Sequence, residues 1–419
     1  MIDGMSFFKC ENDAQFFANK SCLVFQKYHS LKFQTFEVAK NVWACRESNQ
    51  ISKYYFKDEK SIKVLFSGEV YEKISNIEDY IYKLYLNNSL DKVSFIDGSF
   101  SIIIYDERKE KIILLSDRLC TKPLYYWVSN DRFSASTSLE ALLSDNRISR
   151  SIDRGGIVEL LVNHRVTGSS TQYKSIKSLT GSEIVTITKY GVRSHYSRFL
   201  KWSNSSLSQS QLAEKLSIAL INSFKKRYSP DDSTGLLLSG GMDSRIVLAA
   251  ATASNIDLPS VTLCSYYNNE AQVAAKCAEI CNQDFNFIQV PKKSLTSAFE
   301  DSVNASDGLY AAPINLFGSL SKLSIDYNVL FSGHGIDYTL RGMYLPKLQV
   351  RGRTSATNIP ILMPLNSRKR NTAEIIQPIV EKNKNWRDVV INQNIHKYER
   401  MLVDSLSSSL SHLEFNNSY

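Results

Sequence analysis

A glycine-rich turn between an apolar stretch and an alanine-rich stretch constrains the fold of this chain more than any other feature. Residues 236–245 are Leu-Leu-Leu-Ser-Gly-Gly-Met-Asp-Ser-Arg, and an apolar run, Ile246–Ala251, follows. Three consecutive leucines predict a buried strand, and the run after the turn predicts a helix. Strand and helix patterns go on alternating downstream, which predicts a parallel sheet with ligands at the carboxyl ends of its strands. Residues 209–227 predict an amphipathic helix with Leu212, Leu216 and Phe224 near one face, and further helices are predicted at 314–325 and 375–396.

The turn has the composition of an anion-binding site. Gly240 and Gly241 let the backbone approach a ligand closely, and the unpaired amides at the start of the helix favour negative charge. Ser239 and Ser244 add hydroxyl groups. Asp243 would repel a bare phosphate, so we expect it to hold Mg2+ bound to a polyphosphate. A solvated turn with a helix N-cap is the alternative interpretation.

The whole string resembles the pyrophosphate loop of the N-type ATP pyrophosphatases, which split ATP into AMP and pyrophosphate. A second turn, Phe331–Tyr338, resembles the Ser-Gly-Glu-Gly-x-Asp-Glu segment of asparagine synthetases. The resemblance implies ATP and Mg2+ as cofactors, with the metal held by Asp243 and Asp337. The ATP-binding residues that it implies are Leu238, Ser239, Gly240, Gly241, Asp243, Ser244, Leu263, Ser332 and Gly333.

His334 occupies the position of the family's glutamate, which helps the acyl-adenylate step. A neutral imidazole can take a proton near pH 7, so His334 and Asp243 are the catalytic residues that we expect. The alternative, that His334 only packs against the turn or caps it, stays open.

The first half of the chain has the pattern of a β-rich domain. Short segments of strand character recur between turns rich in Asp, Gly, Lys and Asn. They are 22–25, 64–66, 100–105, 111–115, 124–128 and 183–187. Residues 77–86 have helical spacing, so two stacked sheets with flanking helices would fit.

Four segments of this half resemble class II glutamine amidotransferase domains: 66–71, 96–106, 116–126 and 135–142. With the downstream loop, their order resembles that of asparagine synthetases and related β-lactam synthetases and lasso-peptide cyclases, over roughly residues 60–345. The resemblance implies a two-sheet, β-rich Ntn-hydrolase-like domain at 1–203. A doubly wound parallel α/β ATP pyrophosphatase domain, short at its C-terminus, is expected at 204–419.

The amidotransferase pattern is incomplete. The family's catalytic cysteine follows the initiator Met, whereas Ile2 stands here and the first cysteine is Cys10. An internal cysteine has no α-amine to act as its base. Ser67 replaces the asparagine of the family's Asn-Gly-Glu, so we expect Ser67, Gly68 and Glu69 to form a vestigial glutamine site with little or no glutaminase activity.

Composition narrows the classes of protein to which this chain could belong. The chain has 419 residues and a net charge of +8, spread without the dense basic stripe that a nucleic-acid surface would favour. Seven cysteines without paired spacing, no signal peptide and no run of 18 apolar residues predict a cytoplasmic protein that does not span a membrane.

The sequence therefore predicts an ATP-dependent amide-forming ligase that activates a small-molecule carboxylate as an acyl-adenylate, which ammonia or an amine then attacks. Asparagine synthesis and amidation in polysaccharide or specialised-metabolite biosynthesis are the reactions considered, with a homodimer or a separate ammonia-supplying subunit as possible assemblies. The alternative is a catalytically impaired relative that binds nucleotide or a protein partner. A tRNA- or thiol-modifying enzyme with the same loop would need reactive cysteines or a nucleic-acid surface.

Overall fold

The computed structural model describes residues 4–28, 32–47, 56–59, 61–130, 132–163, 166, 168–197, 205–290, 303, 306–308 and 326–336. Two compact units divide the chain. The first contains residues 2–203 together with the short segment 303–311, and the second contains residues 204–302. The turn after β16 (Val329–Ser332) also belongs to the second unit.

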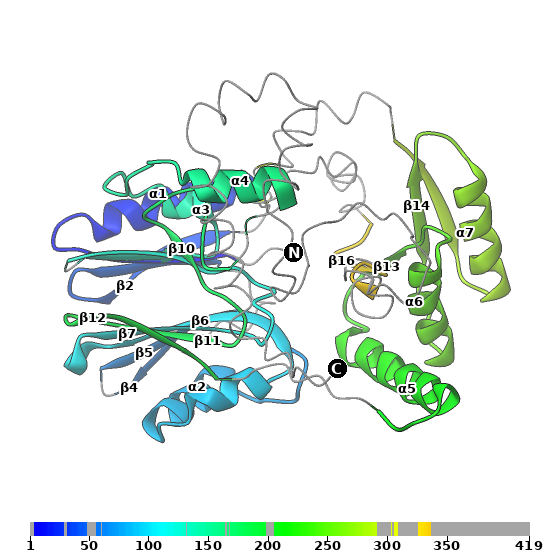
Figure 1. Cartoon of the computed structure of the whole chain (residues 1–419), viewed down its shortest axis with the longest axis horizontal. Coiled ribbons are helices and arrows are strands. Elements are labelled where there is room, and N and C mark those ends of the chain that lie inside the picture. The colour runs from blue at the N-terminus through cyan, green and yellow to red at the C-terminus, as the bar shows by residue number, and fades with distance from the viewer. Residues whose placement is uncertain are drawn as a thin grey trace, which may run out of the picture. The chain divides into compact units, whose positions relative to one another are not determined.

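The first unit contains two antiparallel sheets of six strands each. The first sheet has the spatial order β10 (Lys177–Ser178), β8 (Tyr125–Ser129), β9 (Arg132–Ser136), β1 (Met5–Lys9), β3 (Val42–Glu47), β2 (Phe33–Ala39). The second has the order β12 (Gly191–Tyr196), β11 (Glu183–Thr188), β7 (Lys111–Ser116), β6 (Gly98–Asp106), β5 (Ile62–Val70), β4 (Phe56–Glu59). Figure 1 shows the two sheets stacked face to face.

Alternation along the strands builds the core of this unit. Ile103 and Tyr105 of β6 enter the cluster between the sheets, where they meet Phe7 of β1. Ile102 and Ile104 point to the opposite face and pack against α2 (Ile77–Leu86). Both faces of the second sheet are therefore buried, as expected for a strand whose residues alternate between two apolar layers.

Helix α1 (Ala14–Tyr28) corrects one prediction, because residues 22–25 were expected to be a strand. Ala14, Phe17, Ala18, Cys22 and Phe25 are all buried, at the spacing of one helix face. A window of four apolar residues cannot distinguish a strand from one turn of such a face. The other predicted strands of this half, and the helix at 77–86, are confirmed.

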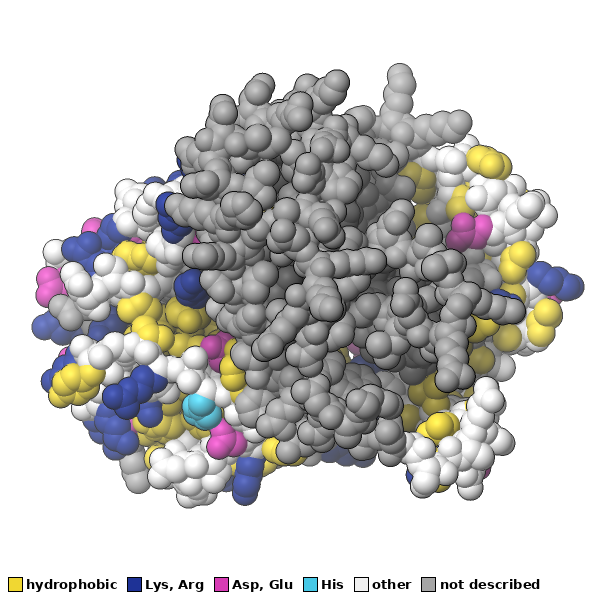
Figure 2. Space-filling view, viewed as in Figure 1, with side chains coloured by type: hydrophobic (Ala, Val, Ile, Leu, Met, Phe, Trp, Pro, Cys, Tyr) yellow, Lys and Arg dark blue, Asp and Glu magenta, His cyan; other side chains and the backbone are white. Residues whose placement is uncertain are grey.

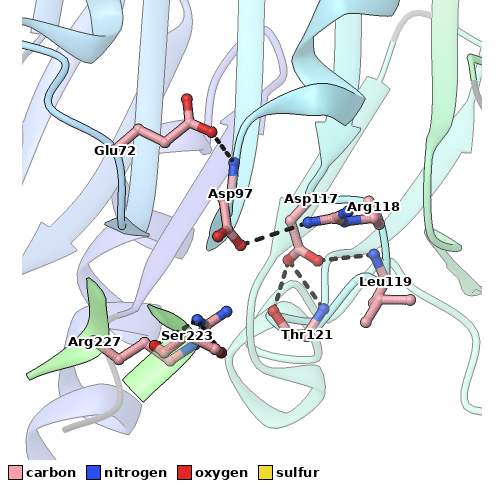
Figure 3. Close-up of polar contacts among 8 residues, drawn as sticks. All are labelled: Glu72, Asp97, Asp117, Arg118, Leu119, Thr121, Ser223 and Arg227. Carbon is pink, nitrogen blue, oxygen red and sulfur yellow. Dashed lines mark hydrogen bonds and ion pairs between the residues drawn. The ribbon is translucent and has the colours of Figure 1, made fainter. Parts of the chain in front are cut away.

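The turn that follows β7 is organised by one buried carboxylate, that of Asp117 (Figure 3). It accepts hydrogen bonds from the backbone amides of Phe100, Leu119 and Thr121 at 3.2, 2.9 and 3.0 Å. The Thr121 hydroxyl donates a further bond at 2.7 Å. One side chain thus satisfies three backbone donors that the turn would otherwise leave unpaired.

A residue from far along the chain also belongs to this unit. The Asp307 carboxylate accepts hydrogen bonds from the amides of Leu139 and Glu140 at 2.8 and 3.3 Å, and from the Ser138 hydroxyl at 3.1 Å. These donors form the start of α3 (Leu139–Leu142). The Asp307 carbonyl accepts a bond from Gln172, which follows α4 (Arg154–Asn163), at 2.7 Å.

The described residues of the second unit form a four-stranded parallel sheet in the order β15 (Phe285–Gln289), β14 (Ser260–Cys264), β13 (Thr234–Leu237), β16. Helices α6 (Met242–Ala253) and α7 (Asn269–Ile280) connect β13 to β14 and β14 to β15. The chain moves outward from β13 in one direction and later adds β16 on the other side. This is the strand order of a doubly wound fold, so the fold class predicted for both halves is confirmed.

Helix α5 (Gln209–Arg227) has the predicted bounds but not the predicted burial. Phe224 is buried, whereas Leu212 and Leu216, expected on the same apolar face, are exposed. Two further predicted helices, 314–325 and 375–396, lie outside the described residues. None of the helices that the structure describes is long and apolar enough to cross a membrane. On the face shown in Figure 2, the described Lys and Arg side chains are interspersed with acidic, polar and apolar ones.

Candidate active site

Two turns meet where the strand order reverses. Strands β13 and β16 pair in parallel, with Leu237 opposite Ser332, so the turns that follow them leave the same edge of the sheet. In a doubly wound sheet this switch point is the usual place for a ligand. The turn 238–241 and the turn 333–336 are therefore the two sides of the candidate site.

Gly333 brings the second turn against the start of α6. A Cβ atom on Gly333 would lie 2.5 Å from the carbonyl carbon of Asp243 and 2.5 Å from the amide nitrogen of Ser244. Both contacts are with backbone, which cannot move aside as a side chain could. A glycine at this position is what allows the two turns to pack without an intervening side chain.

Gly240 packs closely against the backbone of α7, as Gly333 does against α6. Its φ is +70°, and a Cβ there would lie 3.0 Å from the Ala274 amide and 3.0 Å from the Glu270 carbonyl. Gly241, in contrast, would place a Cβ near only one atom, the Ser239 hydroxyl at 3.2 Å. The first glycine is thus required by conformation and packing, whereas the second leaves one side of the turn open.

Ser244 fixes the turn from inside. Its side chain is buried, and its hydroxyl accepts a bond from the Ser239 amide at 3.2 Å. The same hydroxyl lies 3.1 Å from the Ser239 hydroxyl and donates to the Gly241 carbonyl at 3.2 Å. These bonds commit Ser244 to holding the turn, which leaves the exposed Ser239 as the hydroxyl better placed for a ligand.

Helix α6 begins without a side-chain cap. Asn76, Ser208 and Asn268 each accept a hydrogen bond from the first turn of the helix that follows them, α2, α5 or α7. Gly241 occupies that position before α6, and no side chain accepts a bond there. Among the described residues, no capping side chain therefore stands between the open turn and the start of α6, where the positive end of the helix dipole favours an anion.

Two family models match the chain. Residues 56–199 match a glutamine amidotransferase domain, and residues 215–412 match asparagine synthase, so the two turns lie in the second match. The chain is a divergent member of the asparagine synthetase family.

Individual relatives of this family member are distant. It is 26% identical over 207 residues to a putative asparagine synthetase 2 (glutamine-hydrolyzing) of Methanocaldococcus jannaschii, 46% of this chain and 40% of that protein. It is 26% identical over 252 residues to asparagine synthetase 2 of Bacillus subtilis, 52% of this chain and 33% of that one. Amidase chyE of Penicillium rubens is 21% identical over 325 residues, 69% and 45% of the two chains. The chain thus covers less than half of each relative.

Among solved structures, the glutamine PRPP amidotransferase of B. subtilis is similar at 12% identity and a TM-score of 0.34, over 70% of each chain. An NH3-dependent NAD synthetase of Campylobacter jejuni is similar at 14% identity and a TM-score of 0.25, over 51% of this chain and all of that one. These scores are too low to support any argument about the site.

The structure describes one of the two aspartates that are predicted to hold Mg2+ in this asparagine synthetase relative. Asp243 is half-buried in the first turn of α6, beside the uncapped amides. Asp337 follows the second turn but lies outside the described residues. The described part of the chain contains no group of three His, Cys, Asp or Glu side chains that could hold a metal ion.

The other predicted residues have mixed surroundings. His334 is exposed, and its backbone amide lies 3.4 Å from the Ser332 hydroxyl. The Leu238 amide already donates to the Val261 carbonyl at 2.9 Å, and its carbonyl accepts the Thr262 hydroxyl. Both backbone groups of Leu238, a residue that the resemblance assigns to ATP binding, are therefore already engaged with the neighbouring strand. Leu263, at the end of β14, is half-buried.

Cys264 has no sign of nucleophilic activation. Burial, reinforced by the nearby charge of Glu270, raises the pKa of its thiol, so the thiol is protonated at neutral pH. A thiol-modifying enzyme with this loop would need a more acidic cysteine.

The predicted glutamine site lies in the first unit. Gly68 has a φ of +127°, and a Cβ there would lie 2.1 Å from the Ser99 carbonyl, so β5 and β6 approach closely at this point. Ser67 is buried, and within the described structure its hydroxyl has no hydrogen-bond partner, whereas Glu69 is exposed. Cys10 is buried among the side chains of α1, which is a poor position for a nucleophile.

One residue of the loop string was left out of the predicted set. Arg245 is exposed on the first turn of α6, and its Nε donates to the Gly241 carbonyl at 3.3 Å. The predicted set of site residues ends at Ser244. The signal in the sequence was a basic residue one position beyond an anion site.

Proposed function

We propose that this protein is an ATP-dependent carbon–nitrogen ligase of the asparagine synthetase type. A substrate carboxylate oxygen attacks the α-phosphorus of ATP, and the bond from that phosphorus to the bridging oxygen breaks. Pyrophosphate leaves with the electron pair, which produces an acyl-adenylate. Ammonia or an amine then attacks the acyl carbon and releases AMP.

In this proposal the second domain, 204–419, performs the chemistry by positioning and charge neutralisation. The amides near Gly240 and Gly241, with the Ser239 hydroxyl, bind the departing pyrophosphate. Mg2+, held by Asp243 and Asp337, would neutralise phosphate charge when bound. His334 would accept a proton from the attacking amine, as a neutral imidazole can near pH 7.

One observation carries the proposal more than any other. Gly333 packs against the backbone of Asp243 at the point where the strand order reverses. An uncapped helix start, an open glycine turn and a second turn therefore adjoin one another. The asparagine synthase match spans both turns, which supports a nucleotide as the ligand rather than an unrelated anion.

Exchange of labelled pyrophosphate into ATP, measured with a panel of carboxylic acids, tests the proposal. We expect exchange with at least one acid and its loss in Asp243→Asn. Asp257→Asn is the matched control, because Asp257 is an exposed carboxylate that follows the same helix. Absence of exchange with every acid, alongside tight nucleotide binding, would favour the second candidate, a relative that binds nucleotide without catalysis. The replacement of the family's glutamate by His334 is the feature that favours that candidate.

The nitrogen source follows from the first domain, 1–203. Cys10 is buried and Ser67 replaces the family's asparagine, so we propose that this domain hydrolyses little or no glutamine. The nitrogen would then come from free ammonia, from a separate subunit or a second copy of the chain, or from an amine on the substrate. Rapid glutamate release from glutamine by the purified protein would contradict this. Aspartate, a uronic acid and a specialised-metabolite acid are the carboxylates to test first.

A further inference from the structure

We propose that Arg245 binds the departing pyrophosphate and stabilises the negative charge that develops on it. The inference rests on the adenylation proposed above and adds a fixed cation of the protein to the amides, the Ser239 hydroxyl and the Mg2+ of that proposal. It assigns the β- and γ-phosphates of ATP, rather than the AMP part, as the groups that Arg245 recognises.

The charge balance of the two turns calls for such a residue. Residues 239–245 and 332–336 carry one carboxylate, Asp243, and one permanently charged cation, Arg245. When the bond between the α-phosphorus and the bridging oxygen breaks, the electron pair stays on the leaving pyrophosphate, and the site must hold an added negative charge. Helix amides offer partial charges, whereas a guanidinium offers a full positive charge and two parallel N–H bonds to phosphate oxygens.

The side chain is held toward the turn. Its backbone amide donates to the Gly241 carbonyl at 3.2 Å, as in any first helical turn, and its Nε donates to the same carbonyl at 3.3 Å. The guanidinium is thereby folded back toward the start of α6, the direction in which helix side chains normally lean. One of its three nitrogens is used in this way, and the other two remain for a ligand.

The described residues leave the guanidinium of Arg245 accessible to a ligand. Within the part of the chain that the structure describes, no carboxylate forms an ion pair with Arg245, and the side chain is exposed. Arg147 shows the contrary case, because its guanidinium is paired with the buried Asp145. Arg245 therefore lies at the open side of an anion-binding turn and uses only its Nε in a hydrogen bond among the described residues. This geometry suits the recognition of a phosphate group.

The test compares affinities for three probes, Mg-pyrophosphate, Mg-ATP and AMP, in the full-length protein and in Arg245→Gln and Arg245→Lys. We expect Arg245→Gln to weaken pyrophosphate and ATP binding by about tenfold to a hundredfold, the range for a lost charged hydrogen bond, and to leave AMP binding unchanged. Arg245→Lys should retain part of the affinity, since it keeps the charge and loses the Nε bond.

The matched control is Arg227→Gln. Arg227 also bonds the backbone of its own helix, at the Ser223 carbonyl, and stands outside both turns, so its loss removes the same charge without affecting the three affinities (Figure 3). Unchanged pyrophosphate affinity in Arg245→Gln would overturn the inference, as would an equal loss of AMP affinity. Wild-type protein that binds pyrophosphate but catalyses no exchange would contradict the proposed function alone. Wild-type protein that binds none of the probes would contradict both.

Discussion

Gly333 and Asp243 lie so close that a Cβ on the glycine would stand 2.5 Å from the carbonyl carbon of the aspartate. Ninety residues separate the two in sequence, and their contact joins the turn after β16 to the first turn of α6. The candidate site exists because of this contact, since neither turn alone encloses a ligand.

Gly333→Ala should therefore damage the site more than the fold. The added methyl group must push the turn away from α6, and a displacement of about 1 Å can cost about a hundredfold in rate. Pyrophosphate exchange and the midpoint of thermal unfolding measure the two effects. Gly98→Ala is the matched control, since its Cβ would lie 2.5 Å from the Glu69 carbonyl in the first unit. Comparable loss of exchange in both variants would mean that general destabilisation is the cause.

Ser244→Ala should loosen the turn from inside. The substitution leaves the partly buried Ser239 amide without its acceptor at 3.2 Å and removes the bond to the Gly241 carbonyl, so we expect a loss of about 1–2 kcal/mol. Denaturant unfolding measures the change in the free energy of unfolding. Thr252→Ala, on the same helix, removes a hydroxyl that bonds only the Leu248 carbonyl and should cost less than about 1 kcal/mol. Equal costs would show that the Ser244 bonds add nothing specific.

Asp117→Ala should destabilise the first unit strongly. It removes the acceptor of three backbone amides and one hydroxyl, and we expect a loss of about 3 kcal/mol in the free energy of unfolding. Asp97→Ala breaks the partly exposed ion pair with Arg118 at 3.5 Å and should cost about 0–1 kcal/mol (Figure 3). A loss at Asp97 as large as that at Asp117 would contradict this account.

Asp307 should make stability depend on pH. Burial raises the pKa of its carboxyl from 3.8 to about 6. Hydrogen bonds from the amides of Glu140 and Leu139 and from the Ser138 hydroxyl favour the charged form and oppose this increase, whereas the negative charge of Glu140 adds to it. The folded protein thus keeps a proton that the unfolded chain releases, so this contribution to stability is complete below pH 3.8 and is lost as pH rises through about 6.

Asp307→Asn keeps an oxygen acceptor without the charge. The variant should therefore show a smaller fall in the free energy of unfolding between pH 4 and 7 than the wild type, whereas Asp307→Ala should be less stable throughout. Denaturant unfolding at several pH values provides the comparison. An identical pH dependence in Asp307→Asn and wild type would show that another group titrates.

Local patterns determined much of this protein in advance. The apolar run 100–105 predicted a strand, and the leucines before Ser239 predicted β13, because such patterns depend only on near neighbours. The glycines and hydroxyls of residues 239–244 located the anion-binding turn, and the resemblance located the second turn. The prediction of a strand at 22–25 was wrong because four residues are too few to distinguish the two-residue period of a strand from the 3.6-residue period of a helix.

Only the tertiary structure decided how these strands, helices and turns come together at the candidate site. It placed β16 beside β13, turned Ser244 inward, and folded Arg245 back onto Gly241. Within the first unit, it also brought Asp307 to the start of α3. Such contacts join residues that are distant in sequence or depend on which way a side chain faces, and packing of the whole sheet, rather than any local preference, determines both.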